Sequence, residues 1–263
     1  MRIDFHSHVK ISKKSDFMPT YFQEMMAEAQ TSGLTALAMT EHFNTKRFGD
    51  IYDFLEQHYT YENGYYNIEG FKLFPGIEVD VKEVGHILLI GSREDILSIR
   101  KQLDKHTEKE SFIAFDLLMN LAEQYNILKI GAHPFRESTP LYHLKVEQLL
   151  RLDAFDLNGK DLYSQGVHPY HKKLTAFAEK VGLPIVGGSD THQFLQYGSV
   201  YNDLAHECNN VDDLKLCIAS GNYQVHTSPD LELKVKSASL VKDLLKELLK
   251  EQKSNKKEAE MSK

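Results

Sequence analysis

Two histidines separated by one residue, His6 and His8, end a short stretch of alternating apolar residues at the start of the chain. Successive side chains of a strand alternate between its two faces, so residues i and i+2 point to the same side. Two imidazoles held in this way can bind one metal ion if other segments supply the remaining ligands. The spacing therefore predicts part of a metal site that the rest of the chain must complete.

Further metal-ligating residue types stand near the ends of other predicted strands. All but His86 lie at or just beyond the carboxyl end of a strand. Imidazole and carboxylate ligands together suit zinc, manganese or iron. The candidate ligands are His6, His8, His42, Glu78, His86, His133, Asp190 and His192.

The elements that must position these ligands follow from the hydrophobic pattern. Strands are predicted at residues 34–40, 71–81, 84–91, 127–132, 154–157 and 183–186, in addition to the first. Helical periodicity covers 20–32, 146–151, 169–181 and the region 96–124, which is broken by the charged stretch 105–110. Strands that alternate with helices predict a parallel, wound α/β architecture. Polar residues at the carboxyl ends of the strands are typical of the active site of a (β/α) barrel.

The 263 residues suit one α/β barrel domain, which we expect to span residues 1–236. Residues 237–263 are predicted to form a C-terminal amphipathic helix and a charged tail. In the helix, 237–250, five leucines share one face, and we expect them to dock on the barrel while the tail 251–263 frays in solvent. These leucines are Leu240, Leu244, Leu245, Leu248 and Leu249.

Composition and charge exclude some classes of protein. The chain is 41% hydrophobic and 26% charged, and it has no apolar run near the about 20 residues that span a membrane. Its start lacks the apolar stretch of an export signal, so we expect a cytoplasmic protein. Cys208 and Cys217 are expected to be buried, reduced thiols. The net charge of −7 makes nucleic acid an improbable partner, although it does not exclude a small anionic substrate.

Six short motifs in this order resemble those of the PHP (polymerase and histidinol phosphatase) family. The resemblance runs from residue 1 to about residue 195. The motifs are His6-Ser7-His8, Thr40-Glu41-His42, Gly76-Ile77-Glu78, Gly85-His86-Ile87, Ala132-His133-Pro134 and Ser189-Asp190-Thr191-His192.

The resemblance implies a distorted seven-stranded, TIM-like (β/α) barrel with two or three divalent metal ions at its C-terminal mouth. It implies one ion held by His6, His8, Glu78 and Asp190. The bridging carboxylate of Glu78, with His86 and His133, would hold a second ion, and His42 and His192 would hold the third.

The loop after the first strand departs from the family pattern. Members commonly place an acidic residue or a histidine five or six residues after His-x-His, as a ligand of the third ion. This chain has Lys13 and Lys14 there. Asp16 could replace the missing ligand if the loop bulges, or a lysine could hold a phosphate oxygen as a point charge. A solvated loop lysine is the simpler interpretation.

Such a site would hydrolyse a phosphate ester. Three ions would leave it with a charge of about +4 after Glu78 and Asp190 are counted, so a phosphate dianion is attracted. A water that bridges two ions has its pKa lowered from 15.7 toward about 7, which supplies a hydroxide for in-line attack. The sequence thus predicts a small phosphorylated substrate and a metal-bridged hydroxide as the nucleophile.

Three polar residues near these strand ends are candidates for contact with the substrate. Arg136 follows one of the histidines by three residues. We expect it to bind phosphate in a bidentate manner, and we count it with Glu78 and Asp190 as catalytic. Lys160 and His168 are the other candidates. A surface ion pair for Arg136 and an Asn-Gly turn before Lys160 are equally good interpretations.

Several functions remain open at this point. A histidinol-phosphatase-like monoesterase is the first. A phosphodiesterase or exonuclease acting on nucleotides, and a phosphotyrosine phosphatase, are alternatives within the same chemistry. A non-catalytic, metal-binding regulatory module is a third possibility, and a carbon–nitrogen hydrolase of the amidohydrolase type shares the barrel and the His-x-His start. The residues do not identify the physiological substrate, the metal or the oligomeric state.

Overall fold

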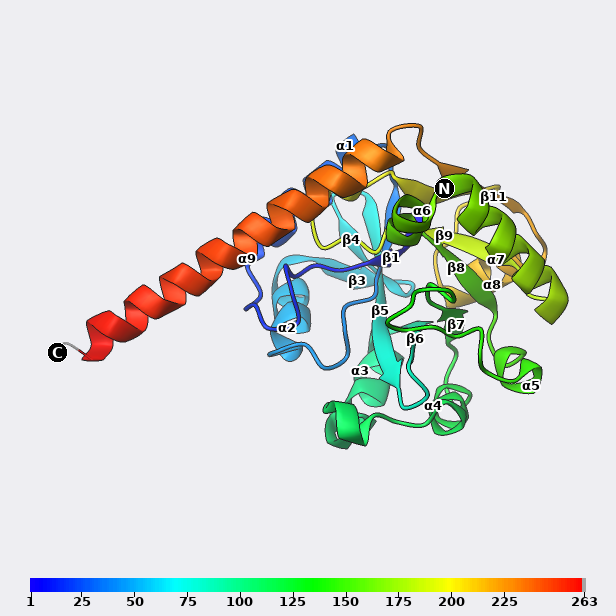
Figure 1. Cartoon of the computed structure of the whole chain (residues 1–263), viewed down its shortest axis with the longest axis horizontal. Helices are drawn as coiled ribbons and strands as arrows, with labels where there is room; N and C mark the ends of the chain where they lie inside the picture. The colour runs from blue at the N-terminus through cyan, green and yellow to red at the C-terminus, as the bar shows by residue number, and fades with distance from the viewer. Residues whose placement is uncertain (262–263) are drawn as a thin grey trace.

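The structure is a computed structural model that describes residues 1–261, with side chains described through Leu249. Seven strands form a nearly closed barrel, which confirms the predicted TIM-like architecture (Figure 1). Two backbone hydrogen bonds close the barrel, from His8 N to the carbonyl of Thr191 at 2.9 Å and from Asp190 N to the carbonyl of His6 at 2.7 Å. In spatial order the barrel strands are β1 (Arg2–Ser7), β2 (Ala36–Met39), β5 (Phe71–Val81), β6 (Gly85–Ile90), β7 (Leu128–Gly131), β8 (Ala154–Asn158) and β9 (Ile185–Gly188).

One strand corrects the prediction of an all-parallel sheet. β6 is antiparallel to both of its neighbours, β5 and β7, whereas the other barrel pairs given above are parallel. Only residues 82–84 connect β5 to β6, and a parallel connection needs a crossover of a dozen residues or more. The start of β6 therefore lies at the same end of the barrel as the carboxyl ends of the other strands, and we call this end the mouth.

Helices surround the barrel (Figure 1). The periodicity predicted those at residues 19–31, 93–102, 115–122, 146–149 and 167–181, but not those at 49–58, 159–165 and 211–219. In the first helix, Pro19–Thr31, the apolar face, including Phe22, Met25 and Met26, is buried. Gly33 ends this helix with a φ of 88°, a conformation that glycine adopts without strain. The charged stretch 105–110 separates the helices Arg93–Gln102 and Phe115–Ala122, as expected. The surrounding helices are α1 (Pro19–Thr31), α2 (Gly49–His58), α3 (Arg93–Gln102), α4 (Phe115–Ala122), α5 (Val146–Leu149), α6 (Gly159–Gln165), α7 (Val167–Val181) and α8 (Val211–Ala219).

Two hairpins extend the sheet to eleven strands. β3 (Thr60–Glu62) pairs with β4 (Tyr65–Ile68), and β4 pairs with the first residues of β5, Phe71 to Leu73. This hairpin therefore lies away from the mouth, because Glu78 and the mouth are at the other end of β5. β10 (Val200–Leu204) and β11 (Tyr223–Thr227) form the second hairpin, and β10 pairs with β1.

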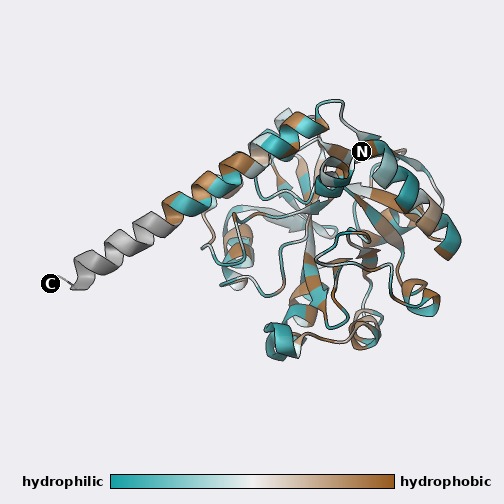
Figure 2. Cartoon of the chain, viewed as in Figure 1, coloured by the Kyte–Doolittle hydropathy of each residue, from teal (hydrophilic) through white to brown (hydrophobic). Residues whose placement is uncertain are grey.

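The C-terminal helix α9 (Leu231–Met261) begins six residues before its predicted start and continues through most of the predicted charged tail. Ser262 and Lys263 lie outside the described residues. The prediction that five leucines share the docked face is wrong: Leu245 and Leu249 pack on the core, whereas Leu240, Leu244 and Leu248 are exposed. Figures 1 and 2 show the helix running along one side of the barrel, and Figure 1 shows that it continues beyond it.

Cys208 and Cys217 are buried and form no disulfide, as expected. Within the described part of the chain, no helix combines the length and the apolar character that crossing a membrane requires.

Candidate metal centre

Four predicted ligands from three strands meet at the mouth. The Nε2 atom of His6 lies 3.5 Å from Glu78 Oε1 and 3.7 Å from Asp190 Oδ1, and the Nε2 atom of His8 lies 3.5 Å from Glu78 Oε2 and 3.3 Å from Asp190 Oδ1. Ligand atoms about 2.1 Å from one ion stand about 3.0–3.4 Å apart in tetrahedral or octahedral geometry. The four groups therefore have nearly the spacing of ligands around a single ion.

Three of these atoms are buried and form no hydrogen bond with the described residues: His6 Nε2, His8 Nε2 and Glu78 Oε2. Glu78 Oε2 lies 2.7 Å from the ring atom Nδ1 of a further candidate ligand, His42. Buried polar atoms are nearly always paired, because an unpaired one costs about 1–3 kcal/mol. Several such lone-pair donors pointing at one another are the arrangement that a cation would satisfy, so the residues present fit a divalent metal ion.

Asp156 orients His6, and sequence reasoning did not identify it. Asp156 Oδ2 lies 2.8 Å from His6 Nδ1 and also accepts a hydrogen bond of 2.9 Å from Asn158 Nδ2. A carboxylate only accepts, so Nδ1 donates and the lone pair of Nε2 faces Glu78 and Asp190. A carboxylate in the middle of a short buried strand was the available signal, because such a group needs a polar partner inside the fold.

A second group consists of Glu78, His86 and His133. Glu78 Oε1 lies 2.6 Å from His86 Nδ1 and 3.4 Å from His133 Nε2. Asp80, two residues after Glu78 on the same face of β5, contacts His86 Nε2 at 3.0 Å and was not predicted. Although burial opposes it, the charge of Glu78 and the hydrogen bond to Asp80 raise the pKa of His86 to about 9. His86 reaches the mouth only because β6 runs antiparallel.

A third group consists of His8, His42 and His192, whose ring nitrogens approach one another closely enough to share an ion. The rings of His8 and His192 are stacked with centroids 4.0 Å apart. His192 Nδ1 donates to the carbonyl of Lys10 at 2.8 Å, which leaves its Nε2 with a free lone pair. Burial lowers the pKa of His42 to about 4, so this imidazole is neutral and available as a ligand.

Lys13 and Lys14, which stand where the family pattern has a metal ligand, line a cavity together with His42 and His192 of the third group. Lys13 forms an ion pair of 2.9 Å with Asp80, and Lys14 is exposed. Asp16 is exposed and lies 2.5 Å from Lys46. Asp16 is therefore outside the third group, and in this structure the loop does not bulge to bring it in.

Of the three candidate substrate contacts, the structure places two beside Asp190. Arg136 lies 2.8 Å from Asp190 Oδ2 and 2.6 Å from Asp161 Oδ2, and Lys160 Nζ lies 3.0 Å from Asp190 Oδ1. Although burial opposes it, Lys160 and Arg136 hold the pKa of Asp190 well below its usual value. His168 is exposed at the start of α7 and joins none of the three groups. That these residues bind substrate stays a prediction.

The backbone of the site is strained and tightly packed. His133 and Asp190 have φ values of 32° and 55°, a region that non-glycine residues rarely occupy. Gly188 leaves no room for a side chain: an added Cβ would lie 2.4 Å from His6 Cβ and 2.8 Å from Asp156 Oδ1. The surrounding fold therefore holds these residues in place at a cost in local energy.

No protein-family model and no curated protein sequence matches the chain. Solved structures do match. PsfC from Pseudomonas syringae PB-5123 superimposes with a TM-score of 0.77 at 21% identity, over 93% of this chain and 98% of PsfC. A protein from Bifidobacterium adolescentis assigned as a metal-dependent phosphoesterase gives a TM-score of 0.50 at 15% identity, over 82% of this chain and 95% of that one.

Endonuclease Q, in complex with a 27-mer duplex that carries an abasic lesion at the active site, is also similar. The TM-score is 0.63 at 19% identity, over 85% of this chain but only 57% of Endonuclease Q. This chain therefore spans little more than half the length of that enzyme. At these identities the comparisons establish the fold alone, a TIM-like barrel.

Proposed function

We propose that this protein is a metal-dependent hydrolase that cleaves a phosphate monoester, with two or three divalent ions held at the mouth by the predicted ligands. The observation that carries the proposal is the position of Glu78. Its two carboxylate oxygens lie within 2.6–3.5 Å of nitrogens of five imidazoles, which come from four different strands or strand ends. A buried carboxylate surrounded in this way is suited to bridge two ions.

Three residues next to the proposed ligands have separate roles in this site. Asp156 holds the proton of His6 on Nδ1, so Nε2 faces the centre. Lys160 places an ammonium group beside Asp190, where it can donate to a phosphate oxygen as a point charge. Arg136 presents a second cation there, partly engaged by Asp161. Bound divalent ions would supply Lewis-acid activation of water and would offset the charge of the phosphate.

The test is metal content by elemental analysis of protein purified without chelator, paired with turnover of p-nitrophenyl phosphate before and after chelation. We expect two or three ions of zinc, manganese or iron per chain and turnover that is lost with the ions and restored by them. Glu78→Gln should lose ions and turnover together while the circular dichroism spectrum stays unchanged. Bound ions without turnover of any phosphate ester would refute the enzymatic proposal and favour a non-catalytic metal-binding module.

A phosphodiesterase or nuclease is the second candidate, and the similarity to Endonuclease Q favours it. The net charge of −7 opposes a long nucleic-acid substrate. Parallel assays with p-nitrophenyl phosphate, bis(p-nitrophenyl) phosphate and a duplex bearing an abasic site separate the two. Cleavage of the diester or the duplex at a kcat/KM above that of the monoester would replace the first candidate by the second.

A further inference from the structure

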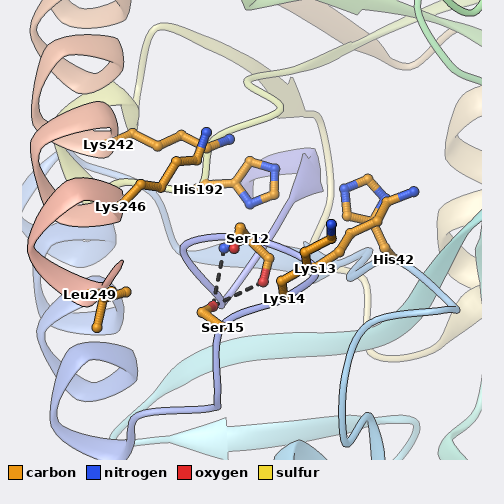
Figure 3. Close-up of a pocket in the computed structure, with 9 residues that line it drawn as sticks. All are labelled: Ser12, Lys13, Lys14, Ser15, His42, His192, Lys242, Lys246 and Leu249. Carbon is orange, nitrogen blue, oxygen red and sulfur yellow. Dashed lines mark hydrogen bonds between the residues drawn. The ribbon is translucent and has the colours of Figure 1, made fainter. Parts of the chain in front are cut away.

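A cavity of about 560 Å³ opens beside the third group of the metal centre. His42 and His192 form its inner wall, the loop after β1 forms one side, and α9 forms the other. Figure 3 shows Lys242 and Lys246 extending from α9 toward His192, while Lys13 and Lys14 of the loop lie nearer to His42. Its volume is in the range of small-molecule sites. The cavity is therefore continuous with the candidate active site and large enough for part of a small ligand.

The lining is cationic in a chain that is acidic overall. It contains four lysines and two histidines, and no carboxylate among the residues whose side chains are described, 1–249. Lys13 is paired with Asp80 at 2.9 Å, and Lys246 has only a distant contact of 3.7 Å with the exposed Asp243. Among the described residues, neither Lys14 nor Lys242 forms an ion pair. Like charges gathered in a concave site focus a positive potential, which favours an anion there.

Lys242 is the lysine of this cavity whose pKa is changed by its surroundings. It is half-buried in the wall, and burial together with the neighbouring Lys160 lowers its pKa to about 7. The acidic groups whose charges act on it are Asp190 and Glu41. Asp190 is a proposed metal ligand, and Glu41 already accepts hydrogen bonds from the backbone N–H groups of Val9 and Lys10. The metal centre would therefore offset much of the negative charge near Lys242, and an anion in the cavity would supply a partner.

The loop that carries the other two lysines is held in a defined conformation. Ser15 Oγ donates to the carbonyl of Ser12 at 2.9 Å, and Ser12 N donates to Ser15 Oγ at 3.2 Å (Figure 3). The carbonyl of Lys13 accepts from Lys46 N at 2.8 Å. A site whose backbone is fixed in this way loses less conformational entropy when a ligand binds.

We propose that this cavity binds a second phosphate group of the substrate, so that the preferred substrate is a small molecule with two phosphates. One phosphate lies at the metal centre and is hydrolysed, and the other is held by Lys242, Lys14 and Lys246. This inference rests on the proposed phosphoesterase function and names its substrate class. It gives α9 a role in specificity, because that helix supplies half of the lysines.

The experiment compares butane-1,4-diol bisphosphate with butane-1,4-diol monophosphate as substrates of the metal-loaded protein. We expect kcat/KM to be about tenfold or more higher for the bisphosphate, the effect of one charge-assisted contact. Lys242→Gln should reduce this ratio about tenfold. Lys236→Gln removes the same charge from an exposed position of the same helix, outside the cavity, and should leave the ratio unchanged.

Calorimetry with non-hydrolysable butane-1,4-bisphosphonate and butylphosphonate provides a readout independent of turnover. The cavity assignment would be supported if the bisphosphonate bound more tightly than butylphosphonate and Lys242→Gln abolished this difference. If the same protein hydrolysed no phosphate ester, only the proposed phosphoesterase function would fail. Equal kcat/KM for the two esters, with a ratio unaffected by Lys242→Gln, would overturn the inference and leave the phosphoesterase function intact. Preference for a 5′-phosphorylated octathymidylate over the bisphosphate would overturn the small-molecule assignment.

Discussion

Asp156 offers a quantitative test of how the metal centre is oriented. Its carboxylate and the ring of His6 are both buried and 2.8 Å apart, so the hydrogen bond between them is charge-assisted. In Asp156→Asn the amide oxygen can take the place of Oδ2 and accept hydrogen bonds from His6 Nδ1 and Asn158 Nδ2. The amide NH₂ then occupies the position of Oδ1, an atom that has no hydrogen-bond partner among the described residues. The orientation of His6 survives, but the charge is lost.

Neutral hydrogen bonds are about half as strong as charge-assisted ones, so we expect this change to weaken metal affinity about tenfold, or about 1.4 kcal/mol. Asp156→Ala also removes the acceptor, which frees the ring to rotate or to change tautomer. For this variant we expect a loss of about 100-fold, or about 2.7 kcal/mol, the upper range for groups that orient a ligand.

The assay is competition for zinc or manganese with a coloured chelator, supported by thermal unfolding of the metal-free proteins to confirm that the variants fold. Asp230→Asn, an exposed change just before α9, is the matched control for loss of an acidic charge and should bind metal as the wild type does. If both Asp156 variants bind metal within twofold of the wild type, Asp156 does not orient His6 and the proposed centre is wrong at this point.

Three further predictions follow from the site. Gly188→Ala should remove metal binding and turnover and destabilise the fold by about 1–3 kcal/mol, because the new Cβ would lie 2.4 Å from His6 Cβ; normal metal content in this variant would contradict the packing. Asp190→Asn should lose ions and p-nitrophenyl phosphate turnover together, as measured by elemental analysis and kinetics, and retained full activity would remove Asp190 from the centre. Because the pKa of His86 is raised to about 9, its proton is bound below that pH in the metal-free protein and must leave when metal binds at Glu78 and His86. Calorimetry at pH 7.5 in buffers of different ionisation heat should detect this release, and affinity should rise by up to about tenfold per pH unit toward pH 9; identical heats in all buffers would refute it.

Sequence reasoning identified residues that the structure brings together at the mouth, because strand ends and residue types are local properties. His6, His8, Glu78 and Asp190 were each singled out from a few neighbouring residues, and their side chains meet in the structure. Their role as metal ligands remains to be tested. The bounds of β5, residues 71–81, were predicted without error, since a long buried strand has a strong pattern.

The groups that support the ligands were not predicted. Asp156, Asp80 and Glu41 all contact candidate ligands or their loop, and each was passed over because a buried carboxylate has no local pattern that names its partner. The register of β1 against β2 also shifts between Asp4 and Ser7, which alters the side-chain alternation just where the first ligands lie. Such shifts depend on the neighbouring strand.

The pattern of residues along the chain was enough to predict the barrel class, most of its strands and the candidate ligand types, because burial imposes periods of 2 and 3.6 on the chain. The pattern did not reveal which candidate ligands share a group, that β6 is antiparallel and brings His86 to the mouth, or that α9 places Lys242 beside the candidate metal centre. The physical reason is that periodicity tells a segment which face to bury but not which distant segment will cover it. That choice depends on strand direction, connection length and the packing of whole elements.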